Sequence, residues 1–293
     1  MTELVVRRLL IDLEAPIAPR WNGGDAFRSA FFNALSLSFP AGEQYFIDAV
    51  RQTLKALPDE QRERFAAEVQ GFVGQEATHR RIHALFNGHL QRQGLPNDIE
   101  RRALRRMQAN AHRDVRVHLG VTAATEHFTA IFAAWLLRHP EALDGAEPRL
   151  RTLWMWHAAE ESEHRSTAFD LYQAISGHHG WRIRLFRYVT AVFLWDLSRQ
   201  TLINLWHDGS LLRASTWRSA WRLLLARDGM FRASFGAWRD YFARDFHPRQ
   251  HDASLSSRWL HDHAAEYAVV TAPLPARRAI EPEAACPSPS PSI

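Results

Sequence analysis

The strongest constraint on the fold is the helical periodicity that runs through almost the whole chain. Between residues 25 and 270, apolar side chains recur every three or four residues in long stretches, separated by short joints with Pro, Gly or Asn. Helices are expected over 38–57, 58–94, 97–139, 148–177, 181–206, 214–227, 230–243 and 253–267. With only 14 Gly and 14 Pro among 293 residues, a turn-rich β fold is disfavoured. The chain is therefore predicted to be all-α.

Composition changes along the chain suggest four parts. We expect an N-terminal extension over 1–24, a helical bundle over 25–180, and a C-terminal helical layer over 181–270 that packs on the bundle. The last part, 271–293, is rich in Pro and Ser and is predicted to be disordered.

Cysteine usage and charge exclude several classes of function. The only cysteine, Cys286, lies in the Pro/Ser-rich tail, which argues against disulfides, Cys-ligated zinc and Fe–S clusters. The chain has 36 basic and 32 acidic residues, and Lys55 is the only lysine. Basic and acidic residues alternate over the first 170 positions without forming a basic stripe, so no nucleic-acid partner is expected. The first residues do not resemble a signal peptide, and we expect a cytoplasmic protein.

Two helices each carry the pattern Glu-x-x-His. The first is Glu76–His79 and the second is Glu161–His164. Residues three apart lie on one face of a helix, so each pair can bind a metal ion from one side. One such pair is a weak signal, because it arises by chance on many charged helices.

A glutamate upstream of each pair strengthens the pattern. Glu43 precedes Glu76 by 33 residues, and Glu126 precedes Glu161 by 35, which makes an approximate internal repeat. If each half folds as an antiparallel helical hairpin, the lone glutamate lies within about one turn of its Glu-x-x-His partner. The spacing therefore predicts that both halves contribute ligands at a similar height.

Four carboxylates and two imidazoles from four helices are the ligand set of ferritin-like di-iron and di-manganese proteins. We therefore predict a ferritin-like four-helix bundle that binds two divalent metal ions. Mixed oxygen and imidazole donors favour Fe, with Mn or Zn as alternatives. The predicted ligands are Glu43, Glu76, His79, Glu126, Glu161 and His164.

Several neighbouring residues are candidates for an additional ligand or for a group that orients one. His83 shares a face with His79, and His157 lies one turn before Glu161. Glu160 is the alternative if the ligand position is shifted by one residue, and otherwise Glu160 and Glu163 are expected to be solvated or to orient a ligand. The remaining, weaker candidates are His127 and Asp170.

One spacing does not fit a simple bundle. Glu76 and Gly94 are 18 residues apart, but Asn97 and Glu126 are 29 apart. An uninterrupted antiparallel helix would displace Glu126 by about 16 Å along its axis. Two explanations stay open: a helix break near 110–114, or a crossover formed by 97–112 between the two hairpins.

At these residues the chain resembles a bacterial family labelled predicted metal-dependent hydrolases. The matching stretches are FFNALSLSFPAGEQYF (31–46), GQEATHRRIH (74–83), TAATEHFTAI (122–131), WMWHAAEESEHRSTAFDLY (154–172) and FHP (246–248). The resemblance implies a ferritin-like helical bundle with two metal ions, and it implies the same six ligands as the spacing argument.

Three functions are compatible with such a centre. The interpretation favoured by the ligand set is O₂-dependent oxidation or hydroxylation of a small apolar substrate by two iron ions, with an external electron donor. The first alternative is a dinuclear hydrolase in which the metal activates water, and additional ligands such as His83 and His157 would favour it. The second alternative is a non-enzymatic ferritin-like iron-binding protein.

The segment 181–259 suggests further partners. It contains seven of the 11 Trp residues, interleaved with Arg. Aromatic and Arg-rich amphipathic helices can lie in the headgroup region of a bilayer, so peripheral contact with the inner face of the membrane is one hypothesis. The other is that the segment packs on the bundle and its Trp side chains fill the core. No apolar run is long enough for a transmembrane helix. A homodimer is a further hypothesis.

Overall fold

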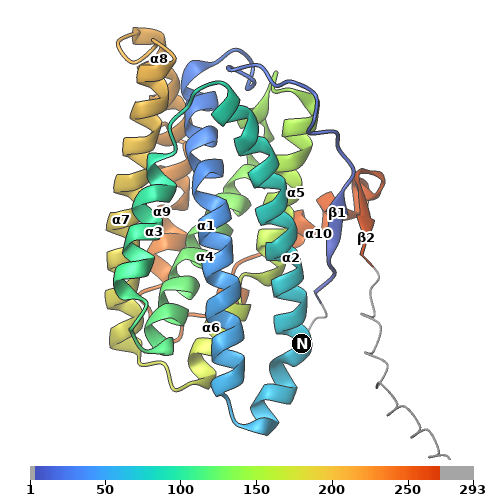
Figure 1. The fold of residues 1–293 in the computed structure, drawn as a ribbon, viewed down its shortest axis with the longest axis vertical. Helices are drawn as coiled ribbons and strands as arrows, with labels where there is room; N and C mark the ends of the chain where they lie inside the picture. The colour runs from blue at the N-terminus through green and yellow to red at the C-terminus, as the bar shows by residue number, and fades with distance from the viewer. Residues whose placement is uncertain (1–3, 271–293) are drawn as a thin grey trace, which may run out of the picture.

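The computed structural model describes residues 4–270, and this part of the chain is almost entirely helical (Figure 1). The helices are α1 (Ala26–Ala56), α2 (Asp59–Arg92), α3 (Asp98–Asn110), α4 (Val115–Arg138), α5 (Pro148–His164), α6 (Thr167–Ala174), α7 (His179–His207), α8 (Ala214–Leu224), α9 (Met230–Asp240) and α10 (Ser254–Asp262). The prediction of an all-α fold is confirmed. A small antiparallel pair of strands, β1 (Arg7–Leu9) and β2 (Tyr267–Val269), was not expected.

Four helices enclose the interior of the molecule. α1 packs along α2, α4 packs along α5, and contacts of α1 with α4 and of α2 with α5 join the two pairs. α3 contacts α1 and α7, and α7 contacts α1 and α4, so these two helices cover the α1–α4 side. Figure 1 shows α3 and α7 beside α1, with α2 on the other side of α1.

Helix α1 begins at Ala26 and not at Ser38, where the sequence suggested an N-cap. Pro40 lies inside the helix, and because it has no N–H it cannot bond the carbonyl oxygen of Ser36. Asn87 of α2 donates its Nδ2–H to this oxygen at 2.9 Å. A side chain from the neighbouring helix therefore replaces the missing hydrogen bond, which the local sequence could not reveal.

Two of the long stretches expected as single helices are interrupted. The stretch 97–139 divides into α3 and α4, with the Asp114 side chain accepting a hydrogen bond from Arg116 N at 2.8 Å at the start of α4. The stretch 148–177 divides into α5 and α6. The break and the crossover proposed for 97–112 occur together, because α3 ends at Asn110 and lies outside the four central helices.

One cluster of buried apolar side chains runs through most of the described chain. It includes Trp21 from the N-terminal segment, Phe32 and Trp154 from the central helices, and Phe186 and Leu197 from α7. The division of the chain into domains stays a prediction, and the predicted disordered tail lies outside the described residues.

The C-terminal helices pack on the bundle but leave most of their tryptophans at the surface. Between 181 and 259 the partly buried ones are Trp238 and Trp259, and the exposed ones are Trp181, Trp195, Trp206, Trp217 and Trp221. The hypothesis that these side chains fill the core is therefore wrong for five of the seven. Across residues 4–270, no helix combines the length and the apolar character needed to cross a bilayer.

Candidate metal centre

The six predicted ligands come together in the interior between the four central helices. None of the six is more than 4% exposed, although all of them are glutamate or histidine side chains. They are Glu43 on α1, Glu76 and His79 on α2, Glu126 on α4, and Glu161 and His164 on α5.

Donor atoms of four of these residues are close enough to share one ion. One atom each from Glu76, His79, Glu161 and His164 all lie within 4.8 Å of one another. His164 Nε2 is 3.6 Å from Glu76 Oε1 and 3.7 Å from Glu161 Oε1. His79 Nδ1 is 3.4 Å from Glu161 Oε1. Both Glu-x-x-His pairs therefore contribute to the same group.

A second group lies beside the first and shares His79 with it. Donor atoms of Glu43, His79 and His157 also lie within 4.8 Å of one another. His157 was predicted only as an additional ligand or as a residue that orients one. The two groups overlap at His79, and the number of ions that they hold stays a prediction.

Glu126 meets the centre through His164. Its Oε2 accepts a hydrogen bond from His164 Nδ1 at 3.1 Å, which leaves His164 Nε2 directed at Glu76 and Glu161. The second oxygen, Oε1, is buried and has no hydrogen-bond partner. Glu126 can therefore orient a histidine with one oxygen and bind an ion with the other.

The unpaired donor atoms fit a bound cation. Both carboxylate oxygens of Glu43 and of Glu76 are buried without a hydrogen-bond partner, and so is Glu161 Oε2. His79 Nδ1 and His164 Nε2 are unpaired as well. Buried polar groups normally have partners, and burying several carboxylates together is costly unless a cation compensates their charge. This donor set is suited to divalent metal ions.

Electrostatics point in the same direction. Burial raises the pKa of Glu43 and Glu76 well above the usual range, and burial raises the pKa of Glu126 to about 7. Burial acts to raise the pKa of Glu161 too, but the nearby imidazoles, His164 first, hold it well below the usual range. Burial would lower the pKa of His79, but the hydrogen bond to Glu160 and the neighbouring Glu161 carboxylate raise it to about 10. In the metal-free protein, the groups with a raised pKa therefore bind protons at the positions where metal ions would bind.

Glu160 orients His79 from the side away from the centre. It is fully buried, and His79 Nε2 lies 3.0 Å from Glu160 Oε2, which leaves His79 Nδ1 for a metal ion. Arg7 Nη1 donates to Glu160 Oε1 at 3.0 Å and to Glu163 Oε2 at 2.7 Å. Glu160 is therefore not solvated, and its contacts fit a residue that orients His79. The sequence contained no sign of Arg7, which is 153 residues away from Glu160.

A row of hydrogen bonds fixes the tautomer of His157. Asn87 Nδ2 donates to Ser36 O, so Asn87 Oδ1 is the acceptor for the Ser36 hydroxyl at 2.7 Å. Ser36 Oγ then accepts from His83 Nδ1 at 2.8 Å, and His83 Nε2 accepts from His157 Nδ1 at 2.6 Å. The pKa of both histidines is lowered, chiefly by burial, and that of His157 is about 4. Neutral His157 therefore carries its lone pair on Nε2, only 2.9 Å from Glu161 Oε1.

That contact places two acceptors against each other. A lone pair on His157 Nε2 and a carboxylate oxygen repel unless a cation lies nearby, so His157 fits an additional ligand. His83 does not face the group and instead orients His157. Ser36 and Asn87 were missed from the sequence, although Asn87 follows His83 by four residues and so shares its helix face.

The two weaker candidates lie outside the centre. His127 Nε2 donates to Ala237 O at 3.0 Å, and burial lowers its pKa to about 3. Asp170 accepts from His247 Nε2 at 2.6 Å and from Arg249 Nη2 at 2.7 Å. Both residues attach the C-terminal segment to the bundle.

Aromatic rings surround the centre. The ring centroid of Trp156 is 5.0 Å from that of His79, and the centroid of Phe72 is 5.0 Å from that of His164. Trp156 and Phe72 are fully buried. These rings exclude water from the flanks of the centre and strengthen the electrostatic interactions inside it.

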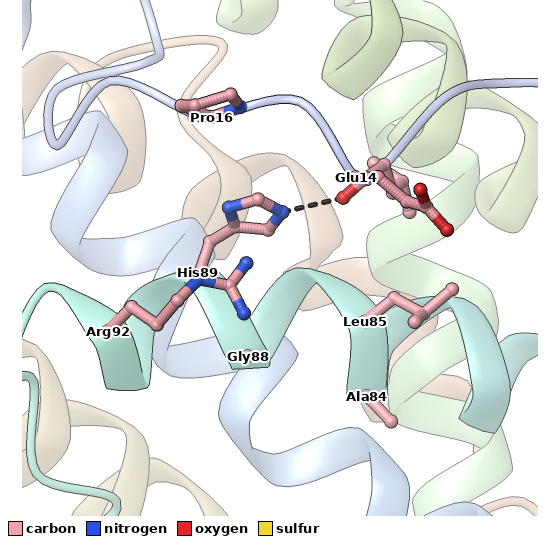
Figure 2. Close-up of a pocket in the computed structure, with 8 residues that line it drawn as sticks. Glu14, Pro16, Ala84, Leu85, Gly88, His89 and Arg92 are labelled. Atoms are coloured by element: carbon pink, nitrogen blue, oxygen red, sulfur yellow. Dashed lines mark hydrogen bonds between the residues drawn. The ribbon is translucent and has the colours of Figure 1, made fainter.

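A surface pocket over α2 is unrelated to the centre. It is lined by the N-terminal segment around Leu13 and by α2 residues near His89, which donates a hydrogen bond to Leu13 O at 2.6 Å (Figure 2). None of the predicted ligands lines it. The hydrogen bond from His89 attaches the N-terminal segment to the surface of α2.

These observations define an all-α protein with a buried carboxylate and histidine centre suited to divalent metal. The chain belongs to the family described as "Predicted metal-dependent hydrolase", whose model matches residues 5–252. Comparisons with curated proteins and with solved structures gave no match.

Family membership and the buried centre together support a metal-dependent enzyme. The family match covers both Glu-x-x-His pairs and agrees with the resemblance found in the sequence. It does not support the preference for di-iron oxidation over hydrolysis, and the hydrolase alternative fits it better.

Proposed function

We propose that the chain is a hydrolase whose ferritin-like bundle holds two divalent metal ions. One ion would be bound by Glu76, His79, Glu161 and His164, and the other on the side of Glu43 and His157, with Glu126 beside both. Ions in such a centre would supply an activated water and polarise the bond to be cleaved. The family match supports hydrolysis as the reaction type.

The observation that carries this proposal is the lone pair of His157. An additional neutral imidazole is what distinguishes this centre from the set of four carboxylates and two histidines typical of ferritin-like di-iron proteins. The hydrogen-bonded row through His83 and Ser36 keeps His157 neutral and directs Nε2 at Glu161. A third imidazole makes the donor set more suitable for Zn as well as for Mn or Fe, and a hydrolase needs no redox-active ion.

The protein's own residues have three roles in this reaction. Glu160 and Glu126 orient His79 and His164, so that each histidine presents one nitrogen to the interior. Trp156 and Phe72 exclude bulk water. Glu43 has two unpaired oxygens, and burial raises its pKa, which suits it to accept a proton.

Di-iron oxidation of an apolar substrate is the second candidate. The specific observation in its favour is the donor set, because carboxylates outnumber imidazoles and come from four helices. This reaction would also require an electron donor. The cytoplasmic location and the homodimer expected from the sequence stay predictions.

The decisive experiment measures metal content and O₂ dependence together. Protein expressed without added metal would be analysed for Fe, Mn and Zn, and its optical spectrum recorded before and after exposure to O₂. Ester, amide and phosphoester substrates would then be tested under anaerobic conditions. We expect two ions per chain and hydrolysis without O₂. An O₂-dependent absorption change, together with turnover that needs O₂ and a reductant, would overturn the proposal in favour of oxidation.

A further inference from the structure

A cavity of about 420 Å³ lies beside the centre, between α3 on one side and α1, α4 and α7 on the other. Cavities of roughly 300–1,000 Å³ are typical of small-molecule sites. The sequence analysis assigned no role to this region. It matters because Glu43, one of the predicted ligands, is part of its wall.

Helix α3 contacts α1 and α7, but much of its inner face lines the cavity. Asp98 and Ile99, at its start, are its only buried residues. Further along, Ala103, Met107 and Asn110 form the stripe that should face a core, yet they are only half-buried and line the cavity. On the opposite wall, Val121 and Thr125 of α4 are also only half-buried and line the cavity. α3 therefore covers a space that is open to a ligand.

The inner wall of the cavity is the boundary of the metal centre. Glu43 lines the cavity, and a carboxylate oxygen of the same residue lies within 4.8 Å of donor atoms of His79 and His157. A smaller pocket of about 50 Å³ lies deeper and is lined by His157 and Glu161.

The large cavity and the small pocket share part of their walls. Phe39, Thr129 and Phe193 line both. The hydroxyl of Thr129 is already bonded to Glu126 O at 2.9 Å, so it offers no free donor. An apolar group that entered between these three side chains would therefore lie next to the centre without losing hydrogen bonds.

The outer end of the cavity is polar and carries excess positive charge. Arg106 lines it and pairs with Asp196, but Arg102 Nε also bonds Asp196, at 2.7 Å, so two guanidinium groups share one carboxylate. Arg113, in the turn between α3 and α4, also lines the cavity and is exposed. His118 bonds the Tyr45 hydroxyl there at 2.9 Å.

We propose that this cavity binds the substrate, an elongated apolar chain with an anionic group at one end. The proposal deepens the proposed function and rests on it for the reaction, although binding itself does not. The anionic end would lie near Arg106 and Arg113, and the chain would pass along α3. The bond to be hydrolysed would lie beside Glu43, where water adds its hydroxyl group to one fragment and its hydrogen to the other.

Binding can be tested with a fluorescent probe and metal-free protein. Dansyl-undecanoic acid becomes bright in an apolar site, and dodecanoate, dodecanol and dodecyltrimethylammonium would compete for it. We expect one probe per chain and competition by dodecanoate at least about tenfold stronger than by the cation. Equal competition by all three compounds would refute the anionic preference.

Two pairs of variants locate the site. Ala103→Trp would fill the cavity and weaken probe binding more than about tenfold, whereas Ala109→Trp, on the exposed face of α3, would not. Arg113→Glu would weaken dodecanoate binding about tenfold but dodecanol binding less than about twofold, and Arg105→Glu would change neither. Unaltered probe binding by Ala103→Trp would exclude the cavity as the site.

Two further measurements separate this inference from the proposed function. Should Ala103→Trp unfold by circular dichroism, Val121→Trp fills the same cavity from α4. Metal content of each folded variant would be measured as well. Loss of probe binding with metal retained supports the cavity. If the parent protein binds the probe but never binds metal, the proposed hydrolase is refuted and the binding site is retained. If it binds metal but not the probe, the binding site is refuted and the proposed hydrolase is retained.

Discussion

Arg7 Nη1 lies 3.0 Å from Glu160 Oε1, and this ion pair connects the N-terminal strand to the metal centre. Glu160 is fully buried and bonds His79 with its other oxygen. Within β1, only Arg7 has a charged side chain that is buried against the bundle. Arg8 is exposed to solvent, and Leu9 is apolar. Strand pairing with β2 holds Arg7 in this position.

Replacing Arg7 should weaken metal binding without touching a ligand. In Arg7→Gln, Glu160 loses its cation and orients His79 poorly, so we expect metal affinity to fall about 10- to 100-fold. The free energy of unfolding should fall by about 3–5 kcal/mol, because a buried carboxylate is left unpaired. Metal titration and chemical denaturation measure both. The matched control is Arg8→Gln, and equal behaviour of the two variants would contradict this role.

Replacing Glu76 should separate metal binding from stability. Glu76→Gln keeps the shape of the side chain but removes a buried carboxyl group that has no hydrogen-bond partner and whose pKa is raised well above the usual range by burial. We expect the variant to lose most of its metal. The metal-free form should be more stable than the parent near neutral pH, because folding no longer requires this group either to take up a proton or to be buried ionised. Glu63→Gln, on the exposed part of α2, is the control. A variant that retains two ions per chain would remove Glu76 from the ligand set.

Replacing either of two neighbouring glutamates, Glu160 or Glu161, should reduce metal binding to different extents. Glu161 has an unpaired buried oxygen and contacts three histidines, whereas Glu160 is bonded to Arg7 and His79. Glu161→Ala should therefore abolish binding of metal, and Glu160→Ala should only weaken it, by about 10- to 100-fold. Elemental analysis after dialysis decides between them. Greater loss in Glu160→Ala would move the ligand by one position. His164→Ala should lose metal as Glu161→Ala does.

The stability of the metal-free protein should fall as pH rises from about 7 to about 9. Two histidines bind protons more tightly in the folded chain than in the unfolded chain: the pKa of His79 is about 10, and that of His164 is raised by Glu161 and Glu126 against the effect of burial. The contribution of Glu126, whose pKa is about 7, is lost at lower pH, between the usual carboxyl value and about 7. The folded state therefore loses its advantage as these protons dissociate.

Metal should reverse this dependence. Since ions replace the bound protons, metal affinity should rise over the same pH range, and the difference in Tm between the metal-loaded and metal-free forms should widen. Thermal denaturation of both forms at a series of pH values is the measurement. A constant difference would mean that ligand protonation is not linked to metal binding.

The exposed face of α7 and α8 should bind anionic bilayers. Trp181, Tyr188 and Trp195 are seven residues apart on α7 and exposed, and Trp195 and Trp206 are 63% and 73% exposed. Exposed arginines lie between them, and the Arg184 guanidinium lies 5.5 Å from the Trp181 ring centroid. Such a face matches an interface of anionic headgroups and acyl chains.

Co-sedimentation with vesicles tests this prediction. The parent protein should pellet with anionic vesicles at physiological salt, and the double variant Trp195→Ala, Trp206→Ala should pellet several-fold less. Leu85→Ala, an exposed apolar residue on α2, is the control. No pelleting at low or physiological salt would eliminate membrane contact. A dimer that buries Trp195, detected by sedimentation velocity, would assign the face to self-association.

Much of the centre was predictable because helical spacing is local. Glu76 and His79 share a helix face whatever surrounds them. In each hairpin the lone glutamate and the Glu-x-x-His pair lie at similar distances from the connecting turn, so the spacing predicts that they meet. The all-α class follows from the same periodicity. These features depend only on neighbours along the chain, so one sequence was enough to predict them.

Other features depend on contacts between distant segments. Pro40 marks a helix start by local rules, and only Asn87 on the neighbouring helix allows α1 to continue through it. No pattern connects Arg7 with Glu160, and the tautomer of His157 depends on three other side chains. The cavity exists because the inner face of α3 is not packed fully against α1, α4 and α7. Periodicity cannot reveal this, because a helix face that lines a cavity has the same apolar pattern as one that packs in a core.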